Sequence, residues 1–416
     1  MVNNGPAGGS RVNWNAGPAV EKGGAMSSSV QARNRFERMS RPKRVFSILV
    51  ALAVVIIALT AAAEGAVRLR QWIRYGSVQD VFYVYRVDPK LGTWFPKPNL
   101  DIVLARRSHI TIDSAGFRSP EIQLTPPTPH TIRLAFLGGS TTFCAEASRN
   151  ETTWPYLVAE KIQQHYPKVK IEFINAAASG YLMHDSLISF ENRVRPYHPD
   201  IVFIYDAHND LHRESHEVAL QKHLIDKPWS NFATPGNDEE DFLMRNSMLL
   251  SLVKKNILYY TAEMEGESPN FKMTVDFDKL SIPYEQRVRD LAAEIRDAGA
   301  IPVLVTFSPR VRPEQTPEQK LEATRHAFIF MPYYTPENLL QGYTAFNNAM
   351  RRIAADSNAV LVGDEYAIPA DKEHYTDDVH FTDAGSASMA DRVTRIIFQD
   401  PVINRLISSR EAEKGS

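Results

Sequence analysis

The feature that most constrains this chain is an apolar run that ends in two glycines and a serine. The run covers Thr131 to Leu137 and is followed by Gly138, Gly139 and Ser140. Its composition, with a single charge, is typical of a strand that is covered on both faces of a parallel sheet. Glycines permit a sharp turn after such a strand, because a Cβ would obstruct the backbone there. The turn can present Ser140 at the carboxyl edge of a sheet, where open α/β sheets bind ligands.

A plainer interpretation of the same stretch is a strand-turn-helix junction without chemistry. In that interpretation Ser140 and Thr141 only cap the helix that follows the turn. The stretch by itself favours neither interpretation. Other parts of the chain must therefore decide whether Ser140 has a chemical role.

Apolar strands and amphipathic helices alternate after residue 130. The predicted strands are 171–174, 201–205, 301–307 and 359–362, and the predicted helices are 154–166, 185–194, 284–298, 336–356 and 383–399. This alternation, without an internal repeat, predicts a doubly wound, mainly parallel α/β sheet in a domain covering 131–400. Insertions near 212–279 and 308–335 interrupt the pattern, and we expect them to select the substrate. Residues 401–416 are expected to form a C-terminal tail.

The amino-terminal part predicts a membrane anchor. Residues 1–44 begin without any apolar period and end in a basic cluster, so we expect a disordered, basic cytoplasmic tail. The uncharged run from Val45 to Ala63 approaches the ~20 residues that cross a bilayer core. The basic residues before this run are Arg33, Arg35, Arg38, Arg41, Lys43 and Arg44, and those after it are Arg68, Arg70 and Arg74.

This excess of positive charge before the run predicts a cytoplasmic amino terminus and an extracytoplasmic domain. A cleaved signal peptide is the alternative, but its apolar region usually has only ~7–15 residues. Both interpretations export the domain. We expect residues 64–130, which carry aromatic and β-branched clusters broken by Pro and Gly, to form a linker and a small extended pre-domain.

Charge and cysteine content exclude some classes of protein. The formal net charge of -2 gives no broad basic surface for nucleic acid, so we expect no such partner. The single cysteine, Cys144, excludes a disulfide within the chain.

A candidate acid and base stand just before the last predicted helix. Asp377 precedes His380 by three residues, so its carboxylate can reach the imidazole, fix its tautomer and stabilise its protonated form. A serine needs such a base before it can act as a nucleophile. Taken alone, the pair is a weak signal and is better explained by a helix entry in which an Asp caps the backbone.

Taken together, four short blocks resemble the SGNH hydrolases, also called GDSL-like esterases. The serine block here is Gly138-Gly139-Ser140-Thr141, and Gly180 matches the glycine block. Asn209, within the run Asn209-Asp210, matches the third block, and Asp377 with His380 matches the last. The blocks occur in the order of that family and cover roughly residues 131–400.

The resemblance implies a role for each of these residues. Ser140 would be the nucleophile, His380 its general base and Asp377 the residue that orients the imidazole. The backbone N–H groups of Ser140 and Gly180 and the side-chain amide of Asn209 would form the oxyanion hole. No cofactor and no metal ion is implied.

The chain departs from the family pattern at two positions. Gly139 and Thr141 stand where the family's name motif has Asp and Leu, which puts little in doubt. Ala207 stands where a glycine usually precedes the Asn-Asp pair, and this departure puts the placement of the Asn209 amide in doubt.

We therefore expect a membrane-anchored serine esterase, with a short acyl ester such as acetate on a glycan as its substrate by analogy with the family. An O-acyltransferase that acts on an envelope glycan is an alternative, as is a catalytically inactive, membrane-tethered binding module. A third hypothesis is a metal site formed by His208, His212 and His216, whose spacing places them on one face of a helix.

Overall fold

The computed structural model describes residues 39–75, 84–104, 108–226, 229, 246–266, 272–357 and 359–412. Residues 1–38 of the expected disordered tail, which was predicted to cover 1–44, therefore lie outside the described residues. The chain divides into two compact units, and the boundary lies between Ala63 and Glu64.

The first unit contains most of helix α2 (Arg41–Tyr75), which is longer at both ends than the predicted span of 45–63. Within the described part of the chain, α2 is the one helix long and apolar enough to cross a membrane. Its apolar side chains are exposed, as at Leu52, Ile56 and Ile57. A lipid-facing helix has this character, whereas the same surface would be unfavourable in water.

The second unit is built on a five-stranded parallel sheet, which confirms the predicted fold class. Its strands are β5 (Thr131–Gly138), β6 (Lys170–Asn175), β7 (Ile201–Tyr205), β8 (Ile301–Val305) and β9 (Val360–Val362). They lie in the order β6-β5-β7-β8-β9. The chain winds outward in both directions from β5, so the carboxyl ends of β5 and β7 flank the switch point at which such sheets bind ligands.

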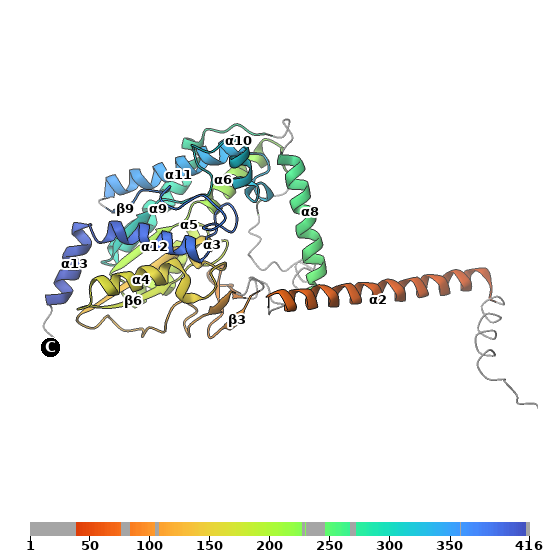
Figure 1. The fold of residues 1–416 in the computed structure, drawn as a ribbon, viewed down its shortest axis with the longest axis horizontal. Coiled ribbons are helices and arrows are strands. Elements are labelled where there is room, and N and C mark those ends of the chain that lie inside the picture. Colours follow the sequence, from red (N-terminus) through yellow and green to blue (C-terminus); the bar gives the residue numbers. More distant parts are fainter. Residues whose placement is uncertain are drawn as a thin grey trace, which may run out of the picture. The chain divides into compact units, whose positions relative to one another are not determined.

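Helices cover both faces of this sheet, as Figure 1 shows. They are α4 (Trp154–His165), α5 (Met183–Ser189), α9 (Phe277–Asp297), α11 (Pro336–Ser357) and α12 (Asp383–Ile397). Crossovers between parallel strands are right-handed, so the reversal of winding at β5 puts α4 on one face and α5, α9 and α11 on the other. Helix α12 packs against α4, and α11 packs against α9.

Two small antiparallel sheets lie in the predicted pre-domain. They pair β1 (Tyr85–Asp88) with β2 (Thr93–Pro96), and β3 (Asp101–Val103) with β4 (His109–Thr111). Both belong to the same compact unit as the large sheet. Their apolar residues share a core with Phe143, just after β5, and with Tyr181, just after β6.

Further helices and helical turns lie in the insertions, at the C-terminus and between the elements of the sheet domain. These are α6 (His208–Gln221), α8 (Met248–Gly266), α10 (Pro317–Thr324), α13 (Pro401–Ala412) and the short turns 150–152, 190–194, 195–197 and 327–329. Residues 401–412 thus form a helix where the sequence predicted a tail. Ile403 and Ile407, one turn apart, are buried in the main core and hold α13 against the sheet domain.

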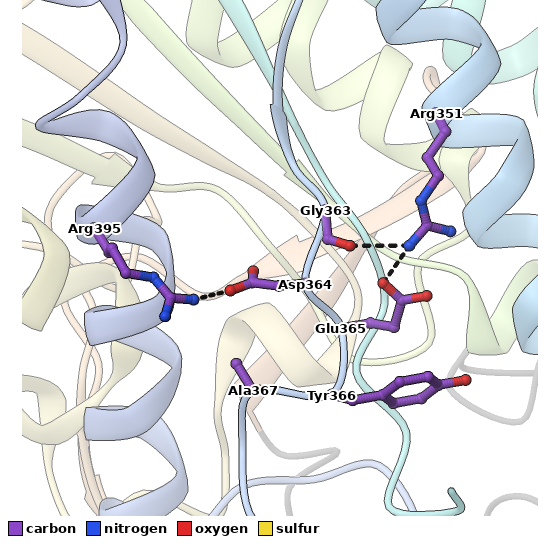
Figure 2. Close-up of a pocket in the computed structure, with 7 residues that line it drawn as sticks. All are labelled: Arg351, Gly363, Asp364, Glu365, Tyr366, Ala367 and Arg395. Atoms are coloured by element: carbon purple, nitrogen blue, oxygen red, sulfur yellow. Dashed lines mark hydrogen bonds and ion pairs between the residues drawn. The ribbon is translucent and has the colours of Figure 1, made fainter. Parts of the chain in front are cut away.

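The chain beyond β9 is held by arginines from two helices. Arg351 of α11 donates to the carbonyl oxygen of Gly363 at 2.9 Å and pairs with Glu365. Arg395 of α12 pairs with Asp364 on the other side. These residues line a pocket of about 450 Å³ at the end of β9 (Figure 2).

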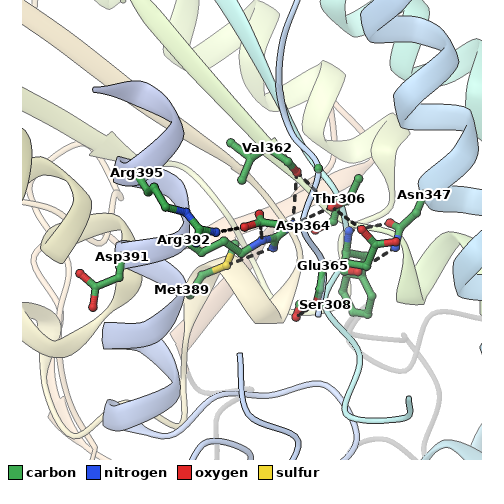
Figure 3. Close-up of polar contacts among 12 residues, drawn as sticks. Thr306, Ser308, Asn347, Val362, Asp364, Glu365, Met389, Asp391, Arg392 and Arg395 are labelled. Atoms are coloured by element: carbon green, nitrogen blue, oxygen red, sulfur yellow. Dashed lines mark hydrogen bonds and ion pairs between the residues drawn. The ribbon is translucent and has the colours of Figure 1, made fainter. Parts of the chain in front are cut away.

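A buried arginine joins this segment to the neighbouring strand (Figure 3). The Arg392 side chain is fully buried and donates to the carbonyl oxygens of Thr306 at 2.9 Å and Val362 at 3.2 Å. Two residues beyond Thr306, the hydroxyl of Ser308 lies 3.2 Å from that of Tyr375. Arg392 therefore fixes the start, and Tyr375 the end, of the loop that leads from β9 to the predicted acid and base.

Candidate active site

A close backbone approach at the end of β5 sets the position of Ser140. Gly138 has φ of 152°, and a Cβ built on it would lie 2.1 Å from the carbonyl oxygen of Tyr205 on β7. Only glycine fits there. Helix α3 (Ser140–Phe143) begins at once and is a single turn, and the hydroxyl of Thr142 donates to the same Tyr205 oxygen at 3.0 Å. Ser140 is thereby fixed at the carboxyl edge of the sheet.

The structure brings His380 and Asp377 to this serine. The Nε2 atom of His380 lies 2.8 Å from Ser140 Oγ, and its Nδ1 lies 2.8 Å from Asp377 Oδ2. The other oxygen of Asp377 accepts the backbone N–H groups of Val379 at 3.0 Å and His380 at 2.8 Å. The short spacing predicted from the sequence is thus a turn closed by the Asp377 side chain, which leaves one carboxylate oxygen for the imidazole.

Charge pairing shifts the pKa of each member of this pair in the direction that stabilises the ion pair. Burial alone would raise the pKa of Asp377, but the adjacent His380 outweighs burial and holds that pKa below its usual range. Burial alone would lower the pKa of His380, but Asp377, with the charges of Glu146 and Asp378, outweighs burial and raises it above the ordinary 6.5. The imidazolium formed by accepting a proton is therefore stabilised.

The thiol of Cys144 has the opposite character. Cys144 is buried at the end of α3, and burial raises the pKa of its thiol to about 12. A thiolate does not form under these conditions, so the thiol cannot compete with Ser140 as a nucleophile.

The two other residues of the expected oxyanion hole converge on the same place. The Asn209 side-chain amide donates to the Tyr181 carbonyl oxygen at 2.9 Å, next to Gly180. A Cβ on Gly139 would lie 2.8 Å from this amide nitrogen, so Gly139 leaves the space that Asn209 occupies. Asn209, Gly180 and the start of α3 therefore meet at one edge of the sheet.

The departure at position 207 does not require a glycine. Ala207 has φ of -163°, an extended value open to any residue, and it is the N-cap of α6. Asn209 follows as the second residue of that helix. Two neighbouring buried carboxyl groups, Asp206 and Asp210, flank this turn, and burial raises the pKa of Asp206 well above its ordinary value.

The β1/β2 hairpin supports the glycine block, a role that the sequence reasoning missed. The Tyr85 hydroxyl accepts the N–H of Ser179 at 2.9 Å and donates to its Oγ at 2.9 Å. The indole N–H of Trp94 donates to the Ser179 carbonyl oxygen at 3.0 Å, and the Tyr181 hydroxyl donates back to Trp94 at 2.5 Å. The residues on both sides of Gly180 are therefore fixed by the hairpin. Aromatic clusters between Pro and Gly were the only signal in the sequence.

Arg118 supports the turn after Ser140 in the same way. It is buried, and its Nη1 donates to the carbonyl oxygens of Phe143 at 2.9 Å and Cys144 at 2.7 Å. Phe143 is the last residue of α3 and Cys144 is its C-cap, whose carbonyl oxygen also accepts the N–H of Ala147 at 3.1 Å. The last carbonyls of a helix have no partner within that helix. A charged donor in this position fixes the helix end.

The three histidines of α6 do not gather around a common point. His208 Nδ1 lies 2.7 Å from the Tyr343 hydroxyl, while His212 packs against His216 and Phe330. Among the described residues, the group whose ligand atoms lie close enough to hold an ion is His326, Asp377 and Asp378.

A comparison with models of protein families finds a match to the part of the chain that carries this site. The model of the GDSL-like lipase/acylhydrolase family matches residues 136–387, more than half of the chain. The chain belongs to that family. The expected relationship is confirmed, and the matched span includes Ser140, Gly180, Asn209, Asp377 and His380. The chain is thus a hydrolase that acts on ester bonds.

Solved structures give more distant likenesses. An acetylxylan esterase from Geobacillus stearothermophilus is 18% identical, with a TM-score of 0.37, over 64% of this chain and 93% of its own. An α/β hydrolase from the metagenome of Lake Arreo, Spain, is 14% identical, with a TM-score of 0.38, over 64% and 94% of the two chains. No protein of curated function matches the chain.

The support of the glycine block by Tyr85 can be tested with Tyr85→Phe. Without its hydroxyl, the buried Ser179 N–H loses its partner, so we expect the free energy of unfolding to fall by about 1–3 kcal/mol. Looser backbone at Gly180 should also lower kcat for 4-nitrophenyl acetate roughly tenfold, with KM little changed. Tyr156→Phe is the matched control, because the Tyr156 ring packs on Phe173 at the sheet surface. Equal behaviour of the two variants would contradict this role of the hairpin.

Proposed function

We propose that Ser140 is the nucleophile of an esterase, that His380 is its general base and that Asp377 orients and stabilises the imidazole. The observation that carries this proposal is the continuous set of hydrogen bonds from Ser140 Oγ through His380 to Asp377, at 2.8 Å each. A neutral hydroxyl becomes an effective nucleophile only when an adjacent base removes its proton. Each member of the set lies within the reach that such a transfer requires.

The reaction follows from these contacts. His380 Nε2 takes the proton of Ser140 as Oγ attacks the ester carbonyl, and the bond from oxygen to carbon forms. The tetrahedral oxyanion is stabilised by the N–H groups of Ser140 and Gly180 and by the Asn209 amide. The C–O bond to the leaving alcohol then breaks, and the imidazolium returns its proton to that alcohol. Water repeats the cycle on the acyl-enzyme and releases the acid.

We propose a short acyl ester on a sugar as the substrate. Aromatic and imidazole rings adjoin the reactive group: Phe330 packs edge-on to both His208 and His326, and the His326 imidazole lies 4.0 Å from Asp377. Trp229 packs near His212 on the same helix as His208. Flat rings of this kind provide surfaces on which a sugar ring can pack, with polar edges that can bond to its hydroxyls.

We also propose that the hydrolase acts outside the cytoplasm and is held at the membrane by α2. The basic residues that precede the apolar part of α2 outnumber those that follow it, and this asymmetry determines which end stays in the cytoplasm. The exposed apolar side chains of α2 support insertion of this helix into lipid.

Alanine variants test the assignment of roles. Because Ser140 and His380 act as one unit, we expect each single change to remove nearly all catalysis, and the double change to cost little more. Asn209→Ala removes one oxyanion donor but leaves the nucleophile and base, so kcat should fall by roughly 10²–10³ with KM little changed. Steady-state kinetics with 4-nitrophenyl acetate measure both effects. Wild-type activity in a Ser140→Ala protein would contradict the mechanism.

A reporter fused after Ser416 tests the topology. Alkaline phosphatase, which is active only after export, should be active in this fusion because the basic excess lies before Val45. A fusion to a reporter that fluoresces only in the cytoplasm is the control and should be dark. The reverse pattern would overturn the proposed orientation.

A further inference from the structure

A second carboxylate and a second histidine lie directly beside the proposed triad. Asp378 follows Asp377 in the chain and is only 3% exposed. Its Oδ1 lies 3.0 Å from Nδ1 of His326, whereas its Oδ2 is buried without a hydrogen-bond partner in the described chain. A buried carboxylate is unfavourable unless a positive charge compensates it. His326 is the group in position to supply that charge.

His326 comes from the second insertion, just after helix α10. Its Nδ1 lies 4.0 Å from Asp377 Oδ2, the oxygen that also contacts the imidazole of His380. Its ring packs edge-on against Phe330, at 5.5 Å between ring centroids. The insertion thus places a second histidine beside Asp377, the member of the triad that does not contact Ser140.

Within the described chain, the charged and titratable groups that face the two histidines come mainly from the loop before α12. His326 faces Asp378 and Asp377 on the loop before α12, with His380 on the same loop and His208 on α6 nearby. His380 faces Asp377, Glu146 and Asp378. Burial alone would lower the pKa of His326, but its hydrogen bond to Asp378 and the charge of that carboxylate outweigh burial and raise it. His326 therefore favours the imidazolium form, paired with Asp378.

We propose that His326 is a positioning residue whose positive charge offsets Asp378, so that Asp378 adds little to the basicity of His380. The proposal rests on the triad assigned above. Without the imidazolium of His326, Asp378 would add a second uncompensated negative charge near His380. His380 would then hold its proton to higher pH and would be unavailable as a base at neutral pH.

The sign of each change follows. Catalysis requires neutral His380, so activity is lost as the pH falls through the pKa of His380. His326→Gln leaves the charge of Asp378 uncompensated, which favours protonated His380. The acid limb of the pH–rate profile, where the rate falls as His380 is protonated, therefore moves to higher pH. Asp378→Asn removes the carboxylate that raises the pKa of His326, so the buried imidazole of His326 becomes neutral and the limb should stay close to its wild-type position. In the double variant both charges are absent, and the limb should return close to its wild-type position.

The experiment measures the rate of labelling by a fluorophosphonate probe against pH, using the full chain in detergent. We expect an upward shift of about one pH unit for His326→Gln and little shift for Asp378→Asn. His165→Gln is the control, because His165 stacks on Phe398 at the end of α12 and should leave the limb unchanged. Thermal melting confirms that each variant is folded, and His326→Asn provides a second neutral replacement.

Three outcomes are distinguishable. An upward shift of the limb in His326→Gln, no such shift in Asp378→Asn and restoration in the double variant support the proposal. Slower labelling without any shift of the limb would show a merely structural role for His326 and overturn it. If labelling persists in Ser140→Ala, the triad assignment itself fails, independently of how His326 behaves.

Discussion

One hydrogen bond, from Ser140 to His380, joins residues 240 positions apart, and the rest of the structure determines whether it forms. On the serine side, the contact between Gly138 and the Tyr205 carbonyl oxygen draws β5 and β7 together and turns the chain into α3. On the histidine side, the buried Arg392 and the Tyr375 hydroxyl fix the loop after β9. Neither side makes the contact by itself, because each hydrogen-bond partner is delivered by a different part of the sheet.

The buried groups near this contact must be matched in charge as well as in position. Two adjacent carboxylates, Asp377 and Asp378, lie within contact of two imidazoles in a region from which water is largely excluded. In such a region charges interact more strongly than in water, and any uncompensated charge is costly. Pairing Asp377 with His380 and Asp378 with His326 gives each carboxylate an imidazole partner, and it places a residue of an insertion next to the reactive group.

Much of the fold and the centre of the site could be predicted from the sequence. Strand β7 begins and ends where its apolar run does, and Ser140, Gly180 and Asn209 were placed correctly at strand ends because parallel strands share one carboxyl edge. The turn at Asp377 and His380 is local, so their spacing was informative.

The missed features depend on contacts between distant segments. Nothing in the spacing of Tyr85 or Trp94 indicates that their polar atoms bond to Ser179, and Arg118 gives no local signal of its role at the end of α3. His326 lies in an insertion without periodicity, and its partner Asp378 is identified only by the folded chain. For α13, the spacing of Ile403 and Ile407 was a helical signal, but its value depended on a core that could accept them.

The central claim is that an acyl group passes through Ser140, and trapping that intermediate tests it most directly. The full chain would be mixed with 4-nitrophenyl acetate, quenched in acid within milliseconds and digested for peptide mass mapping. The account predicts an acetyl group on the peptide that carries Ser140, at the hydroxyl of that residue, and its loss on longer incubation as water releases the acid. A burst of nitrophenol with the acetyl group on another residue, or with no acylated peptide at all, would contradict it.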